Sequence, residues 1–458
     1  MEKIGLIEAI DLNNEYRKML PKDRVQLRKK RLYDLVTYAR DNSPLYKELY
    51  ADIPANFTIR DIPAISKDTI LARFDEWPTD AQIDRQSIDS YLKDPESGSY
   101  DRARKRYLGK YHVISSSGTD SEPLLNLYDD NCCRIMSVEH LLRGFARREH
   151  IWGFIRHGAR LSGIYSTNGA YFYNVFASFR RRYLPLKKKG SLILSAQSPT
   201  SRLVEALNRQ RPAVIAGFPS ALSRMADERV AGRLTVNPVC IIAEGEFLEE
   251  DVRKKIADAF KCDVTSSYST AETGVIAYEC REHHLHLNDD RVILEPVDAY
   301  DRPVPAGTES DKVLITNLLS YPAPIIRYEL GDKVILHEEG CLCGNPSPWI
   351  EISGRSLDQI RFVDGMREIV VPVADLDAVL KDEPCIRRYQ IIIYAGDRIS
   401  LRLTGAKGTD KTMAFFKAEK LLRAYMKSIG IMSPMITLDK ADPGPDPLSG
   451  KYKRIIVE

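Results

Sequence analysis

The spacing of apolar residues changes several times along the chain, between patterns typical of helices and patterns typical of strands. Residues 1–60 are polar, and before a break at Asn42-Ser43-Pro44 their apolar positions recur at roughly helical spacing, notably Leu27, Leu32, Leu35 and Val36. A spacing of three to four residues places side chains on one face of a helix, and an Asn-Ser-Pro sequence favours a break. We therefore expect a helical lead-in.

From about Tyr111 onward, short apolar runs alternate with amphipathic stretches. Residues 213–217 and 239–243 are apolar runs of strand length, whereas the segments that start at Ser220 and span 249–260 have the pattern of helices. Strands that alternate with helices in this way build a parallel sheet. The sequence therefore predicts an α/β fold for this part of the chain.

Beyond Glu279 the sequence becomes rich in strand-forming runs, and these predict a β subdomain that includes residues 292–296 and 312–316. After residue 354 the pattern predicts a hairpin, a helix, a strand and a second helix, at 363–366, 374–380, 389–394 and 410–429. The predicted fold class is α/β. A large N-terminal domain, residues 1–354, combines parallel α/β sheets with the β subdomain, and a small α+β domain spans residues 355–458.

Composition narrows the class of protein. The 458 residues are 43% hydrophobic and 29% charged, which is typical of soluble globular proteins. The formal net charge is only +3, so no overall field attracts nucleic acid or anionic lipid. Acidic residues interrupt the N-terminal stretch where a signal peptide would be apolar, and no later run is long enough to span a membrane. We expect a cytoplasmic protein with no nucleic-acid or membrane partner.

A loop of small residues follows the apolar pair Val113-Ile114. It contains Ser116, Ser117, Gly118 and Thr119 and runs on to Pro123. Hydroxyl and backbone N–H groups in such a loop can surround phosphate oxygens without steric obstruction. By itself the stretch is equally typical of a serine-rich surface turn.

The order of this and later motifs resembles the adenylate-forming superfamily, and within it the phenylacetate-CoA ligase-like family. The loop is similar to the family signature Ser/Thr-Ser-Gly-Thr-Thr-Gly-x-Pro, but Asp120 and Ser121 replace the usual Thr and Gly, and Glu122 stands where Lys is frequent. Two like charges at 4 Å repel by about 4 kcal/mol at an effective dielectric constant of 20. We therefore expect Glu122 to point away from a bound triphosphate or to pair with an arginine.

Further segments resemble the nucleotide site of the same family. The resemblance implies that Glu244 and Gly245 lie against adenine, that Tyr268, Ser269 and Thr270 form the aromatic adenine-binding motif, that Glu272 binds Mg²⁺ and that Asp332 accepts the ribose hydroxyls. A hard carboxylate oxygen suits Mg²⁺, and two acceptor oxygens suit a vicinal diol. Taken alone, Glu272 is also typical of a helix N-terminus and Asp332 of a β-turn.

The acid-binding pocket is expected beside these segments, lined by Tyr165, Phe172, Gly217 and Phe218. These rings favour an aromatic acid, although aromatic clusters also occur as plain core.

Two segments resemble motifs that lie, in proteins of this family, in a mobile C-terminal domain. Arg355 and Asp358 match the hinge, although Leu357 replaces its first acid, and Lys451 matches the lysine that spans the substrate carboxylate and the α-phosphate during adenylation. A lysine suits this task because negative charge builds on the transferring phosphoryl group. A lone lysine near a chain end is otherwise a solvated residue.

Four residues in the strand-rich region offer ligands for a structural zinc ion: Cys280, His286, Cys341 and Cys343. Three thiolates and one imidazole can enclose a tetrahedral zinc without an open position, and some members of the family carry a metal here. His283 and His284 fit the family pattern less well. The alternative is three ordinary reduced cysteines and a surface histidine. The remaining cysteines are expected to be packing residues.

The resemblance implies an enzyme that uses ATP and Mg²⁺ to convert a carboxylic acid into an acyl-adenylate and then transfers the acyl group to a thiol, usually that of coenzyme A. The alternatives are transfer to a carrier protein or an amine, and a nucleotide-binding protein without turnover. Nucleic-acid binding through the basic run 180–189 is disfavoured by the near-neutral charge, and we interpret this run as a solvated face. A homodimer is compatible with all of these functions.

Overall fold

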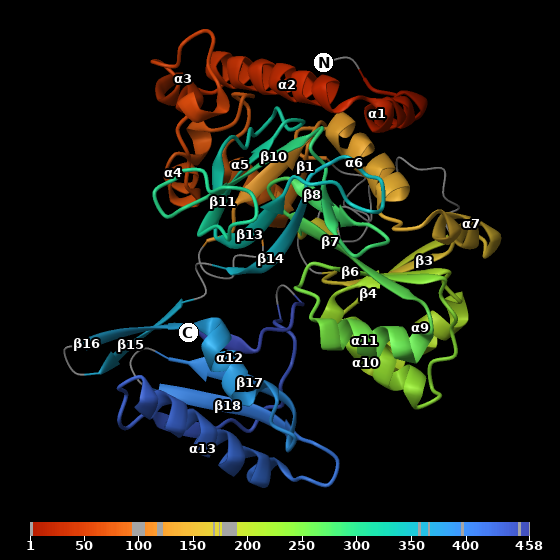
Figure 1. Ribbon diagram of the computed structural model, residues 1–458, viewed down its shortest axis with the longest axis vertical. Helices are drawn as coiled ribbons and strands as arrows, with labels where there is room; N and C mark the ends of the chain where they lie inside the picture. Colours follow the sequence, from red (N-terminus) through yellow and green to blue (C-terminus); the bar gives the residue numbers. More distant parts are fainter. Residues whose placement is uncertain are drawn as a thin grey trace. The chain divides into compact units, whose positions relative to one another are not determined.

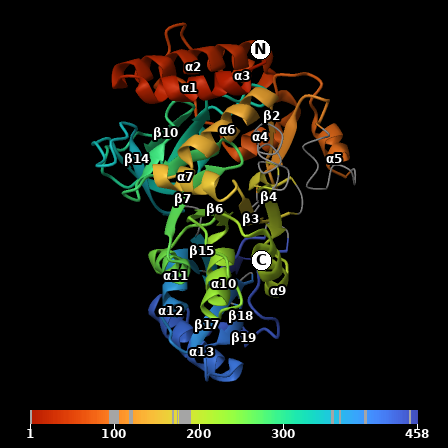
Figure 2. The ribbon, with the colours of Figure 1, turned by 90° about the vertical axis from the view of Figure 1, so that its right-hand side faces the viewer.

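The strand and helix patterns of the sequence reappear in a computed structural model of the chain (Figures 1 and 2). The structure describes residues 3–93, 106–116, 122–167, 170–173, 175, 190–355, 359–364, 367–394, 398–447 and 450–457. The chain divides into a first unit, residues 1–354 with 448–450, and a second unit, residues 355–447 with 451–458. Each unit is described by itself.

The helical lead-in predicted for residues 1–60 is confirmed and extends further. It consists of α1 (Leu6–Lys18), α2 (Pro21–Asn42) and α3 (Pro44–Leu49), followed by α4 (Lys67–Ala72) and α5 (Arg85–Lys93). Proline stands in the first turn of α2 and of α3, where its missing N–H costs no hydrogen bond. Ser43 separates the two helices, and its hydroxyl accepts the Tyr46 N–H at 3.3 Å, which caps α3.

A nine-stranded sheet forms the centre of the first unit, in the order β13-β14-β9-β8-β7-β6-β5-β3-β4. Its parallel part comprises β3 (Leu161–Tyr165), β4 (Ser191–Ser195), β5 (Val214–Gly217), β6 (Cys240–Glu244) and β7 (Asp263–Thr270). The crossover helices α9 (Thr200–Gln210), α10 (Pro219–Val230) and α11 (Glu250–Phe260) lie side by side against these strands (Figure 1). The α/β prediction, including both apolar runs, is therefore confirmed.

Antiparallel strands complete this sheet on the other side of β7. They are β8 (Gly274–Glu279), β9 (Leu285–Leu287), β14 (Trp349–Arg355) and β13 (Asp332–His337). A separate three-stranded sheet contains β10 (Val292–Val297), β11 (Lys312–Asn317) and β12 (Tyr328–Leu330), which confirms the predicted β subdomain. A hairpin of β1 (His112–Ser115) and β2 (Leu125–Tyr128) precedes the helices α6 (Asp130–Arg143) and α7 (Arg148–Arg156).

The second unit is an α+β fold with its own core. A hairpin of β15 (Gln359–Asp364) and β16 (Arg367–Pro372) leads through α12 (Val373–Lys381) to a sheet in the order β19-β18-β17-β20. These strands are β17 (Ile386–Ile393), β18 (Arg398–Gly405), β19 (Met435–Leu438) and β20 (Ile455–Val457). Helix α13 (Lys411–Ser428) packs its buried face on them through Ala418, Leu422 and Met426. In the described residues of the whole chain, no helix is long and apolar enough to cross a membrane.

Ion pairs join helix α6 to the segment between β9 and β10. Glu139 on α6 pairs with Arg291, and both side chains are at most 2% exposed. Arg143, at the end of α6, binds both carboxylate oxygens of Asp290 at 2.8 and 2.9 Å. Burial alone would raise the pKa of Asp290, but Arg143, together with Arg31 and Arg291, outweighs burial and lowers this pKa to about 2. The pair therefore stabilises the fold above the unfolded-state pKa of about 4, and this contribution is lost as the pH falls towards 2.

Arg143→Met tests the contribution of this network. Removing one partner of a buried ion pair leaves an uncompensated charge, so we expect the free energy of unfolding to fall by about 3–5 kcal/mol at pH 7. The exposed Arg148 supplies the control, and Arg148→Ala should change stability by less than about 0.5 kcal/mol. Denaturant titration followed by tryptophan fluorescence measures the free energy of unfolding of the first unit alone, because this unit contains all three tryptophans, Trp77, Trp152 and Trp349. Equal stabilities would contradict the prediction.

Candidate functional site

Several predicted site residues meet where the parallel strands end. Gly217 is the last residue of β5, Glu244 the last of β6, and Tyr268, Ser269 and Thr270 close β7. Carboxyl ends of parallel strands lie at one edge of a sheet, where ligands of α/β proteins bind. The fold therefore gathers segments that are far apart in sequence at one edge of the first unit.

The side chain of Glu244 faces the interior. It is 2% exposed, its Oε2 accepts the Tyr165 hydroxyl at 2.5 Å, and its Oε1 accepts the Ser267 hydroxyl at 3.2 Å. His140 Nδ1 lies 3.9 Å from the same Oε1. The Glu244 carboxylate therefore makes its contacts inside the protein. Any contact of this segment with a ligand would come from the backbone of Glu244 and Gly245.

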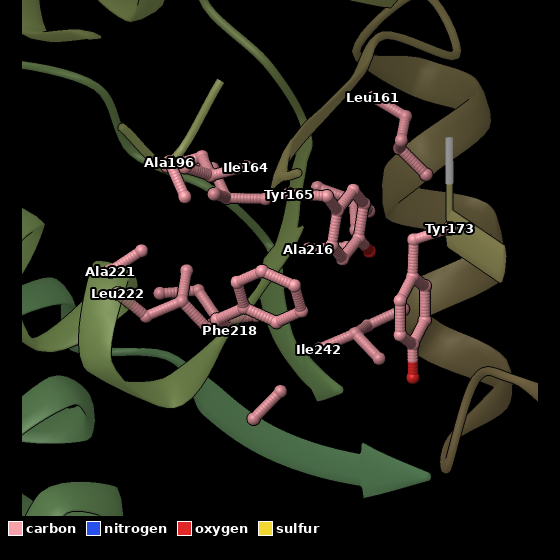
Figure 3. Packing of buried hydrophobic residues seen from close by; sticks show 14 of the residues in the cluster. Leu161, Ile164, Tyr165, Tyr173, Ala196, Ala216, Phe218, Ala221, Leu222 and Ile242 are labelled. Carbon is pink, nitrogen blue, oxygen red and sulfur yellow. The ribbon is translucent and has the colours of Figure 1, made fainter. Parts of the chain in front are cut away.

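The rings of Tyr165, Tyr173 and Phe218 pack against one another (Figure 3), and Gly245 lies beside Tyr173 and Phe218. Tyr165 and Tyr173 are stacked with ring centroids 4.7 Å apart, and Phe218 stands edge-on to both, at 5.7 and 6.0 Å. Tyr165 and Phe218 are buried, as is Phe172, whose ring lies 5.2 Å from that of Tyr173. The residues predicted to line the acid pocket thus form one aromatic cluster at the ends of β3 and β5.

Tyr268 and Asp332 contact each other directly, although 64 positions separate them. The Tyr268 hydroxyl donates to Asp332 Oδ2 at 2.5 Å, and Asp332 is 6% exposed at the start of β13. The neighbouring Ser269 hydroxyl is 2.5 Å from the Tyr173 hydroxyl, and Thr270 Oγ1 is 3.0 Å from Thr273 Oγ1. The structure therefore joins the two segments expected to hold the base and the ribose.

Glu272 lies in the loop between β7 and β8 and is 6% exposed. Its neighbour Gly274 has a positive φ of 74°, and a Cβ there would lie 2.8 Å from Met136 Sδ on α6. Only glycine fits this close approach to α6. The turn after Glu272 is therefore fixed by packing as well as by its backbone conformation.

The predicted phosphate loop is described only at its two ends. Ser116 N–H donates to the Leu124 carbonyl and the Ser116 hydroxyl accepts the Leu124 N–H, both at 2.9 Å, so these residues close the loop at its base. Ser117, Gly118 and Thr119 lie outside the described residues. Glu122 forms an ion pair with Arg85 at 2.8 Å, which confirms the expectation that this acid pairs with an arginine.

The four predicted zinc ligands come together within the first unit. Their ligand atoms all lie within 4.8 Å of one another, with Cys343 Sγ 3.3 Å from His286 Nε2 and Cys280 Sγ 3.8 Å from Cys341 Sγ. His286 Nδ1 lies 2.8 Å from the Ser347 carbonyl, and an N–H donated there leaves Nε2 as the ligand atom. Burial raises the pKa of the Cys280 thiol to about 12, so without a cation this thiol stays protonated at neutral pH. Three thiols and one imidazole at this spacing fit a tetrahedral zinc ion.

Sequence reasoning passed over one residue of this cluster. His284 Nδ1 is 3.3 Å from Cys341 Sγ, and its ring stacks on Trp349 with centroids 3.8 Å apart, while His337 stacks on the opposite face of the same indole. His284 directly precedes β9, which carries His286, so its place beside the thiols depends on the turn between β8 and β9.

The predicted hinge and lysine residues belong to the second unit or its border. Arg355 ends β14, and Asp358 lies outside the described residues. Lys451 is half-buried, and its carbonyl accepts the Asp446 N–H at 2.8 Å. The next residue, Tyr452, anchors this segment by donating its hydroxyl to the Tyr389 carbonyl at 2.6 Å.

Comparison with known proteins supports the fold. No family model matches the chain. Two curated proteins match segments of it: protein CapK of Staphylococcus aureus, 22% identical over 178 residues, and indoleacetate–lysine synthetase of Pseudomonas savastanoi, 26% identical over 142 residues. The matches cover 35% and 30% of this chain, and 38% and 33% of these relatives, so the chain matches little more than a third of the length of either.

A solved structure matches nearly the whole chain. It is a 2-hydroxyisobutyryl-CoA ligase in the postadenylation state in complex with 2-HIB-AMP, with a TM-score of 0.66 and 19% sequence identity over 97% of this chain and 92% of the ligase. The chain therefore has the fold of this ligase.

Gly245→Ala tests the close packing at the end of β6. Gly245 has a φ of 81°, and an added Cβ would lie 2.7 Å from Tyr173 and 2.8 Å from Phe218. The backbone conformation alone costs an L-residue about 1–2 kcal/mol. Gly232→Ala is a matched control, because Gly232 has a φ of 75° with nothing within 4 Å. In denaturant titrations we expect Gly245→Ala to destabilise the first unit clearly more than Gly232→Ala, and equal losses would contradict the aromatic packing.

Proposed function

We propose that the chain, which shares the fold of the adenylate-forming enzymes, activates a carboxylic acid with ATP and Mg²⁺ and then transfers the acyl group to a thiol. The observation that carries this proposal is the contact between Tyr268 and Asp332 at the carboxyl-terminal edge of the parallel sheet. In the family that the sequence resembles, these two positions hold the base and the ribose of one nucleotide. Their direct contact is what a single nucleotide site requires.

The first step is displacement at the α-phosphate of ATP. A carboxylate oxygen of the substrate forms a bond to this phosphorus, the bond to the bridging oxygen breaks, and pyrophosphate leaves with its electron pair. In the proposed site, the Tyr268 ring lies against adenine, Asp332 accepts the ribose hydroxyls, and Ser116, Ser117, Gly118 and Thr119 surround the departing phosphates. Lys451 neutralises charge that builds on the α-phosphate and the substrate carboxylate. Glu272 would hold Mg²⁺, which neutralises charge on the phosphates.

The second step transfers the acyl group from AMP to an acceptor. We propose coenzyme A, whose thiolate attacks the acyl carbonyl so that AMP leaves with its phosphate oxygen. An amine acceptor is the second candidate, and it is favoured by the similarity of 142 residues to indoleacetate–lysine synthetase. Arg355 and Asp358 would serve as the hinge between the two steps, as in the family that the sequence resembles.

The acid is proposed to be aromatic, of the class used by phenylacetate-CoA ligase-like enzymes. The aromatic cluster around Tyr165, Phe172 and Phe218 supports this class, because offset and edge-on contacts between rings are favourable. A screen of pyrophosphate release with aryl, short-chain hydroxy and amino-substituted acids identifies the substrate. Adding coenzyme A or lysine to the responding acid then separates thioester from amide formation.

Lys451→Ala tests the adenylation step. With the acid found in the screen, exchange of pyrophosphate into ATP should fall by about 10²–10³-fold, because the lost cation acts mainly in the transition state. ATP binding, measured by calorimetry, should largely survive. Lys440→Ala provides an exposed lysine control in the same unit and should exchange at the wild-type rate. Full exchange in Lys451→Ala would refute the assignment.

We further propose that Cys280, His286, Cys341 and Cys343 hold one structural zinc ion, because their donor set and mutual distances suit closed tetrahedral coordination. Such an ion would tie the end of β8 and the start of β9 to the segment between β13 and β14. Since β13 begins at Asp332, the ion would support the nucleotide site without acting in the chemistry.

Elemental analysis tests the zinc site. Protein purified without a metal-affinity step should contain about one zinc per chain, as expected for a closed four-ligand site. Cys343→Ser should lose the metal and unfold at a lower temperature. Cys385 lies in the second unit, so Cys385→Ser should keep the metal content and the unfolding temperature of the wild type. Wild-type protein without stoichiometric zinc would refute the site.

A further inference from the structure

The loop that carries Glu272 is held by three side chains through three consecutive carbonyl groups. The Tyr128 hydroxyl donates to the Ala271 carbonyl at 2.6 Å, Asn317 Nδ2 donates to the Glu272 carbonyl at 3.2 Å, and Arg291 Nη1 donates to the Thr273 carbonyl at 3.2 Å. The donors come from β2, from β11 and from the segment between β9 and β10. Three separate parts of the first unit therefore converge on one three-residue turn.

All three donors are inside the protein. Tyr128 and Asn317 are 0% exposed and Arg291 is 1% exposed. A buried hydrogen bond that loses its partner leaves a polar group unsatisfied, so each contact is costly to break. Carbonyl groups in connecting loops usually meet water at the surface, whereas these are fixed from inside. The peptide planes on both sides of Glu272 are therefore restrained, and with them the direction in which its side chain leaves the backbone.

Two of the donors are themselves fixed. Arg291 pairs with Glu139 on α6 and also donates to the Val275 carbonyl. Asn317 Oδ1 accepts the Leu319 N–H at 3.2 Å, which orients its amide so that Nδ2 faces the loop. Arg291 and Asn317 thus have their orientations set by contacts outside the loop, as pre-organised sites require.

Tyr128 adds a connection to the predicted phosphate loop. It ends β2, whose partner β1 runs from His112, opposite Tyr128, to Ser115, opposite Leu125. The predicted phosphate loop joins these two strands at the Ser115 end of the hairpin. One hydroxyl therefore connects the hairpin that carries the phosphate loop to the turn that carries Glu272.

We propose that Tyr128, Asn317 and Arg291 are positioning residues that hold the Glu272 carboxylate where it binds the cation of the ATP complex. The inference rests on the proposed function, because it assumes that Glu272 serves Mg²⁺. It assigns these three residues no contact with substrate.

Tyr128→Phe is the most direct test, because it removes one oxygen and keeps the ring. The Mg²⁺ concentration that gives half-maximal ATP–pyrophosphate exchange should rise about five-fold, the factor that corresponds to one ordinary hydrogen bond. The exchange rate at saturating Mg²⁺ should stay near that of the wild type. The affinity for AMP, measured by calorimetry in the presence of EDTA, should not change, since AMP binding without metal does not use Glu272.

Tyr46→Phe is the matched control. Tyr46 is also 0% exposed, and its hydroxyl donates to a backbone carbonyl, that of Pro324, at 2.8 Å. Both variants should lose a similar amount of stability, but only Tyr128→Phe should change the Mg²⁺ requirement. An unchanged requirement in Tyr128→Phe, or the same rise in Tyr46→Phe, would overturn the positioning role.

Glu272→Gln separates this inference from the proposed function. If Glu272→Gln raises the Mg²⁺ requirement strongly and Tyr128→Phe does not, the positioning role is wrong while the metal role of Glu272 stands. If Glu272→Gln leaves the Mg²⁺ requirement unchanged, the metal role fails and the positioning role fails with it. A large rise in Glu272→Gln and a smaller rise in Tyr128→Phe support both.

Discussion

A single buried guanidinium, that of Arg291, connects most of the parts that build the first unit. A charge with 1% exposure cannot be hydrated, so the fold has to supply its partners. It does so with Glu139 on α6, with the Thr273 carbonyl in the turn between β7 and β8, and with the Val275 carbonyl in β8. The preceding residue, Asp290, binds Arg143 at the end of α6 and accepts a hydrogen bond from α2 through its carbonyl. The N-terminal helices, α6 and the central sheet are thus tied together at the base of the Glu272 turn.

The residues proposed to bind the nucleotide and its cation belong to the first unit, whereas the proposed catalytic lysine belongs to the second unit. Tyr268, Glu272 and Asp332 are all presented by strands or short turns of the first unit, and each is fixed by buried neighbours. Lys451 stands on the second unit, which has its own apolar core and its own sheet. In the proposed reaction, the first unit sets the position of the nucleotide, and the lysine completes the charge arrangement for one chemical step. Because Lys451 belongs to a separately folded unit, it can serve that step without disturbing the residues that hold the nucleotide.

Local pattern was sufficient for most of the elements, and the family resemblance supplied the candidate ligand-binding residues, but neither indicated the buried residues that support them. The runs at 213–217 and 239–243 are strands because short apolar stretches between amphipathic helices have no other place than a buried sheet. No local pattern marks Arg291 as a buried charge, because its partner Glu139 lies 152 positions earlier. Glu244 was expected against the adenine, yet its carboxylate faces the interior, because Tyr165 and Ser267 supply donors that no local pattern indicates. The four proposed zinc ligands could be picked out because their residue types are rare and chemically specific, and the structure brings them together.

An acid in the second half of the predicted phosphate loop, Glu122, is an objection to an ATP site, because it would repel the phosphates. In the structure this acid forms an ion pair with Arg85. The Glu122 carboxylate is 60% exposed, so the pair contributes little to stability. Its consequence is electrostatic. An anion beside a triphosphate is repelled by about 4 kcal/mol at 4 Å and an effective dielectric constant of 20, but a guanidinium 2.8 Å from that anion largely cancels its field. Because Arg85 belongs to α5, outside the loop, the compensation is absent from the loop's own sequence. The acid at position 122 therefore does not argue against phosphate binding.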